Sequence, residues 1–194
     1  MYLLGHLGIT ALSGHGMEKI LNYKNPNLNY PYGLLLIGSM WPDLIDKPIG
    51  SLIFSTGRWI AHSVLFILIS GIILYFVLKN MQRKLAFIES SIFIWGALMH
   101  ILLDLPSIEP QVVFWPVLGI YLPIKAWNGF LFGVFSPYIW LTEIIGLICL
   151  IGIGSRHKIS QNLWRLGFLA LTGYIVLYSV LFFFWVLIVS QQMN

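Results

Sequence analysis

The sequence predicts an all-α protein, a bundle of helices embedded in a membrane. Of its 194 residues, 58% are hydrophobic and only 9% are Asp, Glu, Lys or Arg, whereas a soluble globular domain carries roughly 25% charged residues. Several apolar runs also approach the ~20 residues that a helix needs to cross a bilayer. This composition argues against a soluble enzyme, a disulfide-rich secreted scaffold and a disordered protein.

Four apolar runs predict transmembrane helices. They cover residues 62–78, 85–103, 137–155 and 166–190. The third run begins at Pro137, and proline suits the first turn of a helix. The last run contains no formally charged side chain.

Three weaker apolar stretches accompany these helices. Residues 1–17 and 33–42 predict two shorter N-terminal helices, of which the second is too short to cross a bilayer unaided. Residues 112–124 contain Pro116 and Pro123. Prolines so placed predict a re-entrant or interfacial segment, which is tolerated where protein or water covers the backbone.

The chain is expected to form a single integral-membrane domain over residues 1–194, because no repeat, low-complexity tract or linker divides it. Residues 1–125 are expected to contain the core of a functional site. Residues 126–194 are expected to hold the two C-terminal transmembrane helices.

Basic residues predict the orientation, because cytoplasmic loops of membrane proteins are rich in Lys and Arg. Three of them lie between the first two predicted transmembrane helices, and three lie between the last two. They are Lys79, Arg83, Lys84, Arg156, Lys158 and Arg165. We therefore expect a multi-pass protein of the inner or plasma membrane with both of these loops in the cytoplasm and the C-terminus outside.

This topology brings the rare Asp and His side chains to one level near the outer face. The candidate metal ligands are His6, Asp43, Asp46, His62, His100 and Asp104. Mixed imidazole and carboxylate ligands suit zinc, manganese or iron. His100 and Asp104 are four residues apart in a predicted helix and should share one side of it. Charged groups at such positions are costly and are usually functional or paired.

Two of the motifs that supply candidate ligands are also compatible with a structural role without a metal. Asp43 and Asp46 stand in WPDLIDKP, which is also compatible with a polar interfacial turn in which Asp46 pairs with Lys47. Two neighbouring carboxylates repel each other unless a cation or a basic group lies between them. His62 is also compatible with an interfacial histidine at the start of a helix, capped by an upstream Ser or Thr.

The order of motifs resembles a known family. An early His in a Gly-rich first helix is followed by PD..D.P, GR...HS, H...D and a WP pair. Over residues 1 to about 125, the chain resembles the membrane-bound metal-dependent hydrolases, also described as LexA-binding, inner-membrane-associated hydrolases. Those are related to the all-helical zinc phospholipase C and single-strand nuclease superfamily. The resemblance implies a shared zinc ion with ligands Asp43 or Asp46, His62, His100 and Asp104, and it implies that His6 serves a second metal.

The chain departs from that family at several positions, and these departures reduce the number of metal ions that we expect it to bind. Gly57 and Ala61 stand where many members have His and Thr, and the two aspartates are one residue further apart than in PDxD. The soluble relatives use a later set of ligands, His, His and Glu. After Asp104 this chain offers only one histidine, His157, and that residue lies in a basic loop. We therefore expect one or two metal ions. Separately, His15 lies half a helical turn from the direction of His6 and is expected to face away from the site.

Four residues are expected to assist the reaction. Asp43 or Glu143 would take a proton from the attacking water. Arg58 or Lys47 would neutralise a phosphate, since guanidinium suits bidentate phosphate contacts, although both side chains can also snorkel to the interface. For Glu143 the structural alternative is an ion pair with Lys125 or Arg58.

The expected function is hydrolysis of a phosphoester by a metal-activated water. The substrate would be a lipid or another membrane-associated or phosphorylated small molecule, and the cofactor would be zinc, with manganese or iron as alternatives. No nucleic-acid partner is expected, because the chain offers no soluble basic face. Two other functions stay open: a divalent metal or ion transporter that uses the same cluster, and a non-catalytic membrane regulator with a structural metal.

Overall fold

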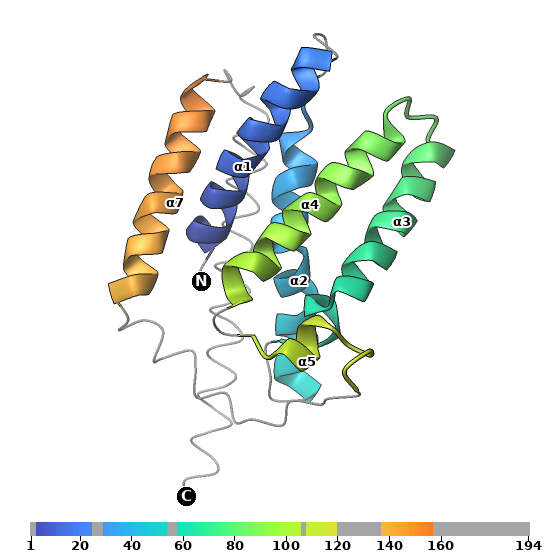
Figure 1. Cartoon of the computed structure of the whole chain (residues 1–194), viewed down its shortest axis with the longest axis vertical. Coiled ribbons are helices and arrows are strands. Elements are labelled where there is room, and N and C mark those ends of the chain that lie inside the picture. Colours follow the sequence, from blue (N-terminus) through green and yellow to red (C-terminus); the bar gives the residue numbers. More distant parts are fainter. Residues whose placement is uncertain (1–2, 25–28, 54–57, 106–107, 120–136, 157–194) are drawn as a thin grey trace, which may run out of the picture. The chain divides into compact units, whose positions relative to one another are not determined.

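The structure is a computed structural model that describes residues 3–24, 29–53, 58–105, 108–119 and 137–156 (Figure 1). All regular structure in these residues is helical, as the sequence predicts. The elements are α1 (Leu3–Lys24), α2 (Tyr32–Ile53), the 3-10 turn η1 (Ile60–His62), α3 (Val64–Asn80), α4 (Ala86–Asp104), α5 (Pro110–Val113) and α7 (Pro137–Arg156). Every contact described below lies within one compact unit, Met1–Ile153.

Helix α4 is the element against which α1, α2 and α3 pack (Figure 1). Two glycines allow α2 and α4 to touch through their backbones. A Cβ atom added at Gly38 would lie 2.2 Å from the carbonyl oxygen of Phe93, and one added at Gly96 would lie 2.2 Å from that of Leu35. Small residues are the usual means by which membrane helices approach so closely, and here they fix the α2–α4 contact.

The described helices expose many apolar side chains and bury polar ones. Ile73 and Phe76 on α3 and Phe87 on α4 are 59%, 60% and 73% exposed. The buried polar side chains at the opposite end of α4 and nearby are His6, Thr10, Ser39, Asp43, Asp46, His62, Ser63, His100 and Asp104. An apolar exterior is suited to lipid, and buried charged groups in such surroundings need partners.

Helix α2 differs from the expectation. Instead of a short helix over residues 33–42 and a turn, one helix runs over Tyr32–Ile53 and includes Pro42 and Pro48. The alternative in which WPDLIDKP forms a polar interfacial turn is therefore excluded, because the motif is helical. Helices in membrane proteins tolerate proline where neighbouring groups satisfy the freed backbone atoms. Because the motif is helical, Asp43 and Asp46 are three residues apart on one face.

The remaining helix bounds shift by smaller amounts. Helix α1 continues to Lys24, and α4 and α7 lie within one residue of their expected bounds. Helix α3 begins at Val64, because the Ser63 hydroxyl caps it by accepting the N–H of Phe66 at 3.2 Å. His62 consequently lies in η1, ahead of the helix, and not in its first turn.

Among the described residues, only α4 is long and apolar enough to cross a membrane. Val64–Asn80 and Leu141–Gly154 are shorter apolar helices. The sequence predicted four transmembrane helices, and the described residues contain one that meets this criterion. Helix α3 has 17 residues where ~20 are needed, and the predicted helix over 166–190 lies outside the described residues.

The segment expected to be re-entrant or interfacial is described as far as Gly119. It begins with α5 and continues in turns. Val112 and Val113 are buried in an apolar cluster with Ile67 and neighbouring residues of α4, whereas Val117 is 86% exposed. This part therefore rests on the bundle with one side and presents apolar atoms on the other.

The close approach of α2 and α4 predicts a clear difference between two glycine substitutions. Gly96→Ala is expected to lower the free energy of unfolding by about 1–3 kcal/mol, because its methyl group collides with the Leu35 carbonyl. Gly16→Ala is the control, because nothing lies within 4 Å of its added methyl group, and Ala is favoured over Gly in helices by about 1 kcal/mol. Thermal unfolding in detergent would compare them. Equal stability of Gly96→Ala and the parent would contradict the described packing.

Candidate metal centre

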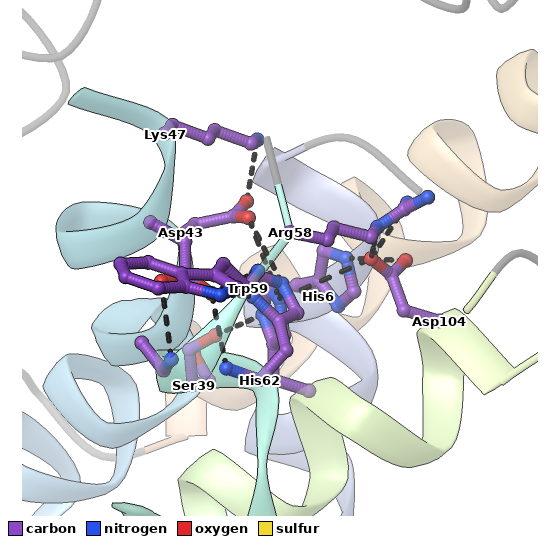
Figure 2. Close-up of polar contacts among 11 residues, drawn as sticks. His6, Ser39, Asp43, Lys47, Arg58, Trp59, His62 and Asp104 are labelled. Carbon is purple, nitrogen blue, oxygen red and sulfur yellow. Dashed lines mark hydrogen bonds and ion pairs between the residues drawn. The ribbon is translucent and has the colours of Figure 1, made fainter. Parts of the chain in front are cut away.

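Side chains from α1, α2, η1 and α4 converge at the C-terminal end of α4 (Figure 2). They form two groups, which we call the Asp43 triad (Asp43, His62, His100) and the His6 triad (His6, His100, Asp104). In each triad the possible ligand atoms lie within 4.8 Å of one another. All five residues are at most 5% exposed. The structure thus brings together five of the six metal ligands expected from the sequence.

The Asp43 triad has the spacing of a metal site. His62 Nε2 lies 3.5 Å from Asp43 Oδ1, and His100 Nε2 lies 3.6 Å from the same oxygen. The two Nε2 atoms are 3.4 Å apart. Ligand atoms that surround a tetrahedral zinc ion at its usual bond lengths are separated by about 3.3 Å. The three donor atoms therefore need little movement to accept one ion.

Hydrogen bonds fix which ring nitrogens face the triad. His100 Nδ1 donates to the Ser39 carbonyl oxygen at 2.6 Å, and His62 Nδ1 donates to Asp46 Oδ2 at 2.7 Å. A neutral imidazole carries one proton, so Nε2 of each ring then presents a lone pair. Two lone pairs that face each other repel, and a cation between them removes that repulsion. Outer hydrogen bonds of this kind accompany most metal-binding histidines.

Asp46 holds the backbone of η1. Its carboxylate accepts the N–H groups of Trp59 at 2.6 Å, Ala61 at 3.0 Å and His62 at 3.1 Å, in addition to His62 Nδ1. Four donors occupy the two oxygens, and Asp46 belongs to neither triad. The sequence left open which aspartate is the direct ligand. The geometry favours Asp43 in that role and makes Asp46 the residue that orients His62.

In the His6 triad a buried histidine makes no hydrogen bond to the described residues. His6 is 0% exposed, and its ring stacks on that of His100 with the centroids 4.1 Å apart. His6 Nε2 lies 3.2 Å from Asp104 Oδ1, but neither ring nitrogen of His6 is aligned for a hydrogen bond. Because a buried polar group without a hydrogen bond is costly, the poorly aligned contact of Nε2 with Asp104 and the unpaired Nδ1 make the His6 ring a candidate metal ligand.

Two basic side chains border the triads (Figure 2). Arg58 contacts Asp104 Oδ2 through Nη2 at 2.9 Å and Nε at 3.2 Å, while Lys47 pairs with Asp43. The Arg58 side chain is 35% exposed and that of Lys47 is 19% exposed, whereas the carboxylates are buried. With Asp46 counted beside Asp43 and Asp104, three carboxylates face two cations, so the centre carries one net negative charge when its histidines are neutral, and that charge attracts a further cation.

The charged groups around His62 also favour an added cation. Burial by itself disfavours the charged imidazolium, but hydrogen bonds and charge from Asp43 and Asp46 outweigh burial and raise the His62 pKa above its ordinary value. This part of the centre therefore favours an added positive charge. Either a proton or a metal ion can supply it, and the oxygen and nitrogen donors around His62 suit zinc, manganese or iron.

Two other candidates lie apart from the triads. Both carboxylate oxygens of Glu143 accept backbone N–H groups at the start of α1, from Leu4 at 2.8 Å and Gly5 at 3.1 Å. Of the two ion pairs that the sequence suggested for Glu143, the one with Lys125 falls outside the described residues, and Arg58 pairs with Asp104. His15 Nδ1 contacts Glu18 Oε2 at 3.3 Å and joins neither triad, as expected. His157 lies outside the described residues.

The sequence analysis missed contacts made by backbone atoms. The Ser39 carbonyl anchors His100, and the N–H groups of Trp59 and Ala61 anchor Asp46. Every residue has such groups, so no residue type signals them. Only the helical spacing between Ser39 and Asp43 could have suggested that both lie near one side of α2.

The comparisons with known proteins concern the family alone. A family model described as YdjM inner membrane protein matches residues 1–189. No curated protein and no solved structure matches the chain.

The geometry predicts different losses for the two aspartates of α2. Asp43→Asn should abolish high-affinity zinc binding, because it removes a charged member of a triad. Asp46→Asn should weaken binding about 10–100-fold, the usual effect of losing a group that orients a ligand. Competition with a chromophoric chelator would measure both. Glu89→Gln is the control, because Glu89 pairs with Arg83 near the start of α4. Wild-type affinity in both Asp variants would contradict these roles.

Proposed function

The chain belongs to the YdjM inner membrane protein family, and we propose that it is a membrane-embedded, metal-dependent hydrolase. One observation carries this proposal: two buried Asp/His triads share His100, and their donor atoms face one another without a protein hydrogen bond at His6. A purely structural cluster would be expected to satisfy its own buried polar atoms. The resemblance seen in the sequence adds the reaction class.

The described residues fit a divalent metal. Asp43, His62 and His100 would hold one ion, and His6 and Asp104 would complete its surroundings or hold a second ion. His100 offers one free lone pair, at Nε2, because its Nδ1 donates to Ser39. The two triads therefore cannot both use His100 at the same time. Zinc suits these nitrogen and oxygen donors, and manganese or iron are the alternatives.

The reaction would be hydrolysis of a phosphoester. A bound divalent metal supplies Lewis acidity, which makes a water molecule nucleophilic near neutral pH and polarises a substrate oxygen. Asp43 or a neighbouring carboxylate would accept the proton of that water. Glu143 is less suited to this step, because both of its oxygens accept backbone N–H groups. Asp46 would keep His62 in the required tautomer.

Lys47 and Arg58 support an anionic substrate. Each contacts a triad carboxylate and keeps part of its side chain exposed. A phosphate group that enters between Lys47 and Arg58 would replace the carboxylates as the partner of both cations. The planar guanidinium of Arg58 is suited to two parallel hydrogen bonds with phosphate oxygens.

The position of the triads favours a membrane-associated substrate. Arg83 and Lys84 precede α4, and the triads lie at its other end. Basic loops are cytoplasmic by the positive-inside rule, so a multi-pass arrangement would place the triads near the outer face. The exposed apolar residues after α5 would then lie at the lipid headgroups. Together these features favour a lipid phosphoester.

Activity provides the test of this proposal. Protein purified without chelator should contain metal and hydrolyse a member of a panel of phospholipids and phosphomonoesters. Asp104→Ala should reduce turnover at least 100-fold, because it removes a carboxylate of the His6 triad. Glu89→Gln, at the other end of α4, should retain the parental rate.

Other outcomes identify the competing functions. Metal uptake into liposomes without hydrolysis of any substrate would overturn the proposal in favour of a transporter. Stoichiometric metal without hydrolysis or uptake would favour a regulator in which the metal connects helices. Absence of metal from the purified protein, with no binding of added zinc, would contradict both the hydrolase and the regulator.

A further inference from the structure

We propose that Glu143 of α7 is a positioning residue, which holds the start of α1 so that His6 reaches the metal centre. This inference rests on the proposed function, because it assigns a role to α7 in the same site. Glu143 lies outside both triads. Its effect would pass through the backbone of Leu4 and Gly5, the two residues that precede His6.

The contact of Glu143 is bidentate. Its Oε2 accepts the N–H of Leu4 at 2.8 Å, and its Oε1 accepts the N–H of Gly5 at 3.1 Å. The first N–H groups of a helix have no partner within the helix. A negative charge at this end is also favoured by the helix dipole. Glu143 therefore caps α1 from another helix and sets the position of its first turn.

Glycines bring α1 and α7 into backbone contact around the same turn. A Cβ atom added at Gly8 would lie 1.9 Å from the Gly146 carbonyl oxygen. One added at Gly146 would lie 2.1 Å from the Leu4 carbonyl oxygen and 2.7 Å from the Gly5 Cα atom. No side chain fits between the helices at these positions. The contact therefore fixes the register of α1 on both sides of His6.

His6 needs such external support more than the other two histidines do. Hydrogen bonds at Nδ1 orient His62 and His100, but neither ring nitrogen of His6 makes one. Among the described residues, the ring of His6 is held by stacking on His100 and by the contact with Asp104. The position of the His6 ring is therefore set mainly by the position of the α1 backbone.

Asp46 and Glu143 use the same device. Asp46 accepts three backbone N–H groups of the turn that ends in His62, and Glu143 accepts two from the turn that contains His6. In both cases a carboxylate outside the triads holds the main chain beside a histidine of the triads. The parallel supports a positioning role for Glu143 in place of a ligand or base.

A double-mutant cycle with zinc as the probe tests this role on the full-length protein in detergent. The four proteins are the parent, Glu143→Gln, His6→Ala and the double variant. Glu143→Gln should weaken zinc binding about tenfold, because the amide NH2 that replaces one carboxylate oxygen donates and cannot accept the second N–H. The double variant should bind zinc no more weakly than His6→Ala alone. Glu89→Gln should retain the parental affinity.

A matched glycine pair tests the same contact without altering charge. Gly146→Ala should weaken zinc binding, because its methyl group collides with the Leu4 carbonyl. Gly152→Ala lies on the same helix, nothing is within 4 Å of its added methyl group, and it should bind zinc like the parent. Thermal unfolding without metal checks that each variant is folded.

Three results would overturn the inference. Parental zinc affinity in Glu143→Gln and Gly146→Ala would do so while leaving the proposed function intact. A further loss in the double variant beyond His6→Ala would show that Glu143 acts independently of His6. Absence of zinc binding by the parent protein would remove the proposed function and this inference together.

Discussion

Ionisable side chains that are buried among apolar helices must neutralise one another, and this requirement organises the described part of the chain. Asp46 accepts backbone N–H groups, Asp43 pairs with Lys47, and Asp104 pairs with Arg58. The imidazoles complete the cluster, except that the two ring nitrogens of His6 make no hydrogen bond to the described residues. The remaining need for positive charge is what makes this cluster a candidate metal centre and not only a polar core.

Close helix packing sets the dimensions of the cluster. Gly96 and His100 are one turn apart on α4, and a Cβ at Gly96 would lie 3.0 Å from the backbone nitrogen of Ser39. The same approach brings His100 within hydrogen-bond distance of the Ser39 carbonyl. Small residues thus do more than allow the helices to associate. They place an imidazole against the main chain of a neighbouring helix, and that main chain determines its tautomer.

The sequence predicted much of the centre because side-chain types and helical spacing are visible in it. His100 and Asp104 were expected on one side of α4, and His6, Asp43 and His62 were expected to join them; all five meet in the triads. The helical course of the Pro42 motif was not predicted, because an isolated sequence cannot show the neighbouring groups that make proline tolerable in a helix.

The backbone groups that donate to Asp46 and Glu143 were not predicted, for a related reason. Asp46 was expected to be a ligand and Glu143 a base, because a sequence shows the charge of a carboxylate but not the groups that donate hydrogen bonds to it. Both carboxylates accept backbone N–H groups in the structure. Fewer membrane-crossing helices are found in the described residues than were predicted, because α3 and the apolar part of α7 are short and the predicted helix over 166–190 lies outside those residues.

The hydrogen bond between His100 and the Ser39 carbonyl has a consequence for the genetics of this protein. Its acceptor is a main-chain atom, so replacing the Ser39 side chain leaves the acceptor in place. An alanine scan would therefore overlook position 39 as a support of His100. The information that maintains this contact is distributed over the residues that determine the path of α2, and it would become visible only through changes that displace the helix.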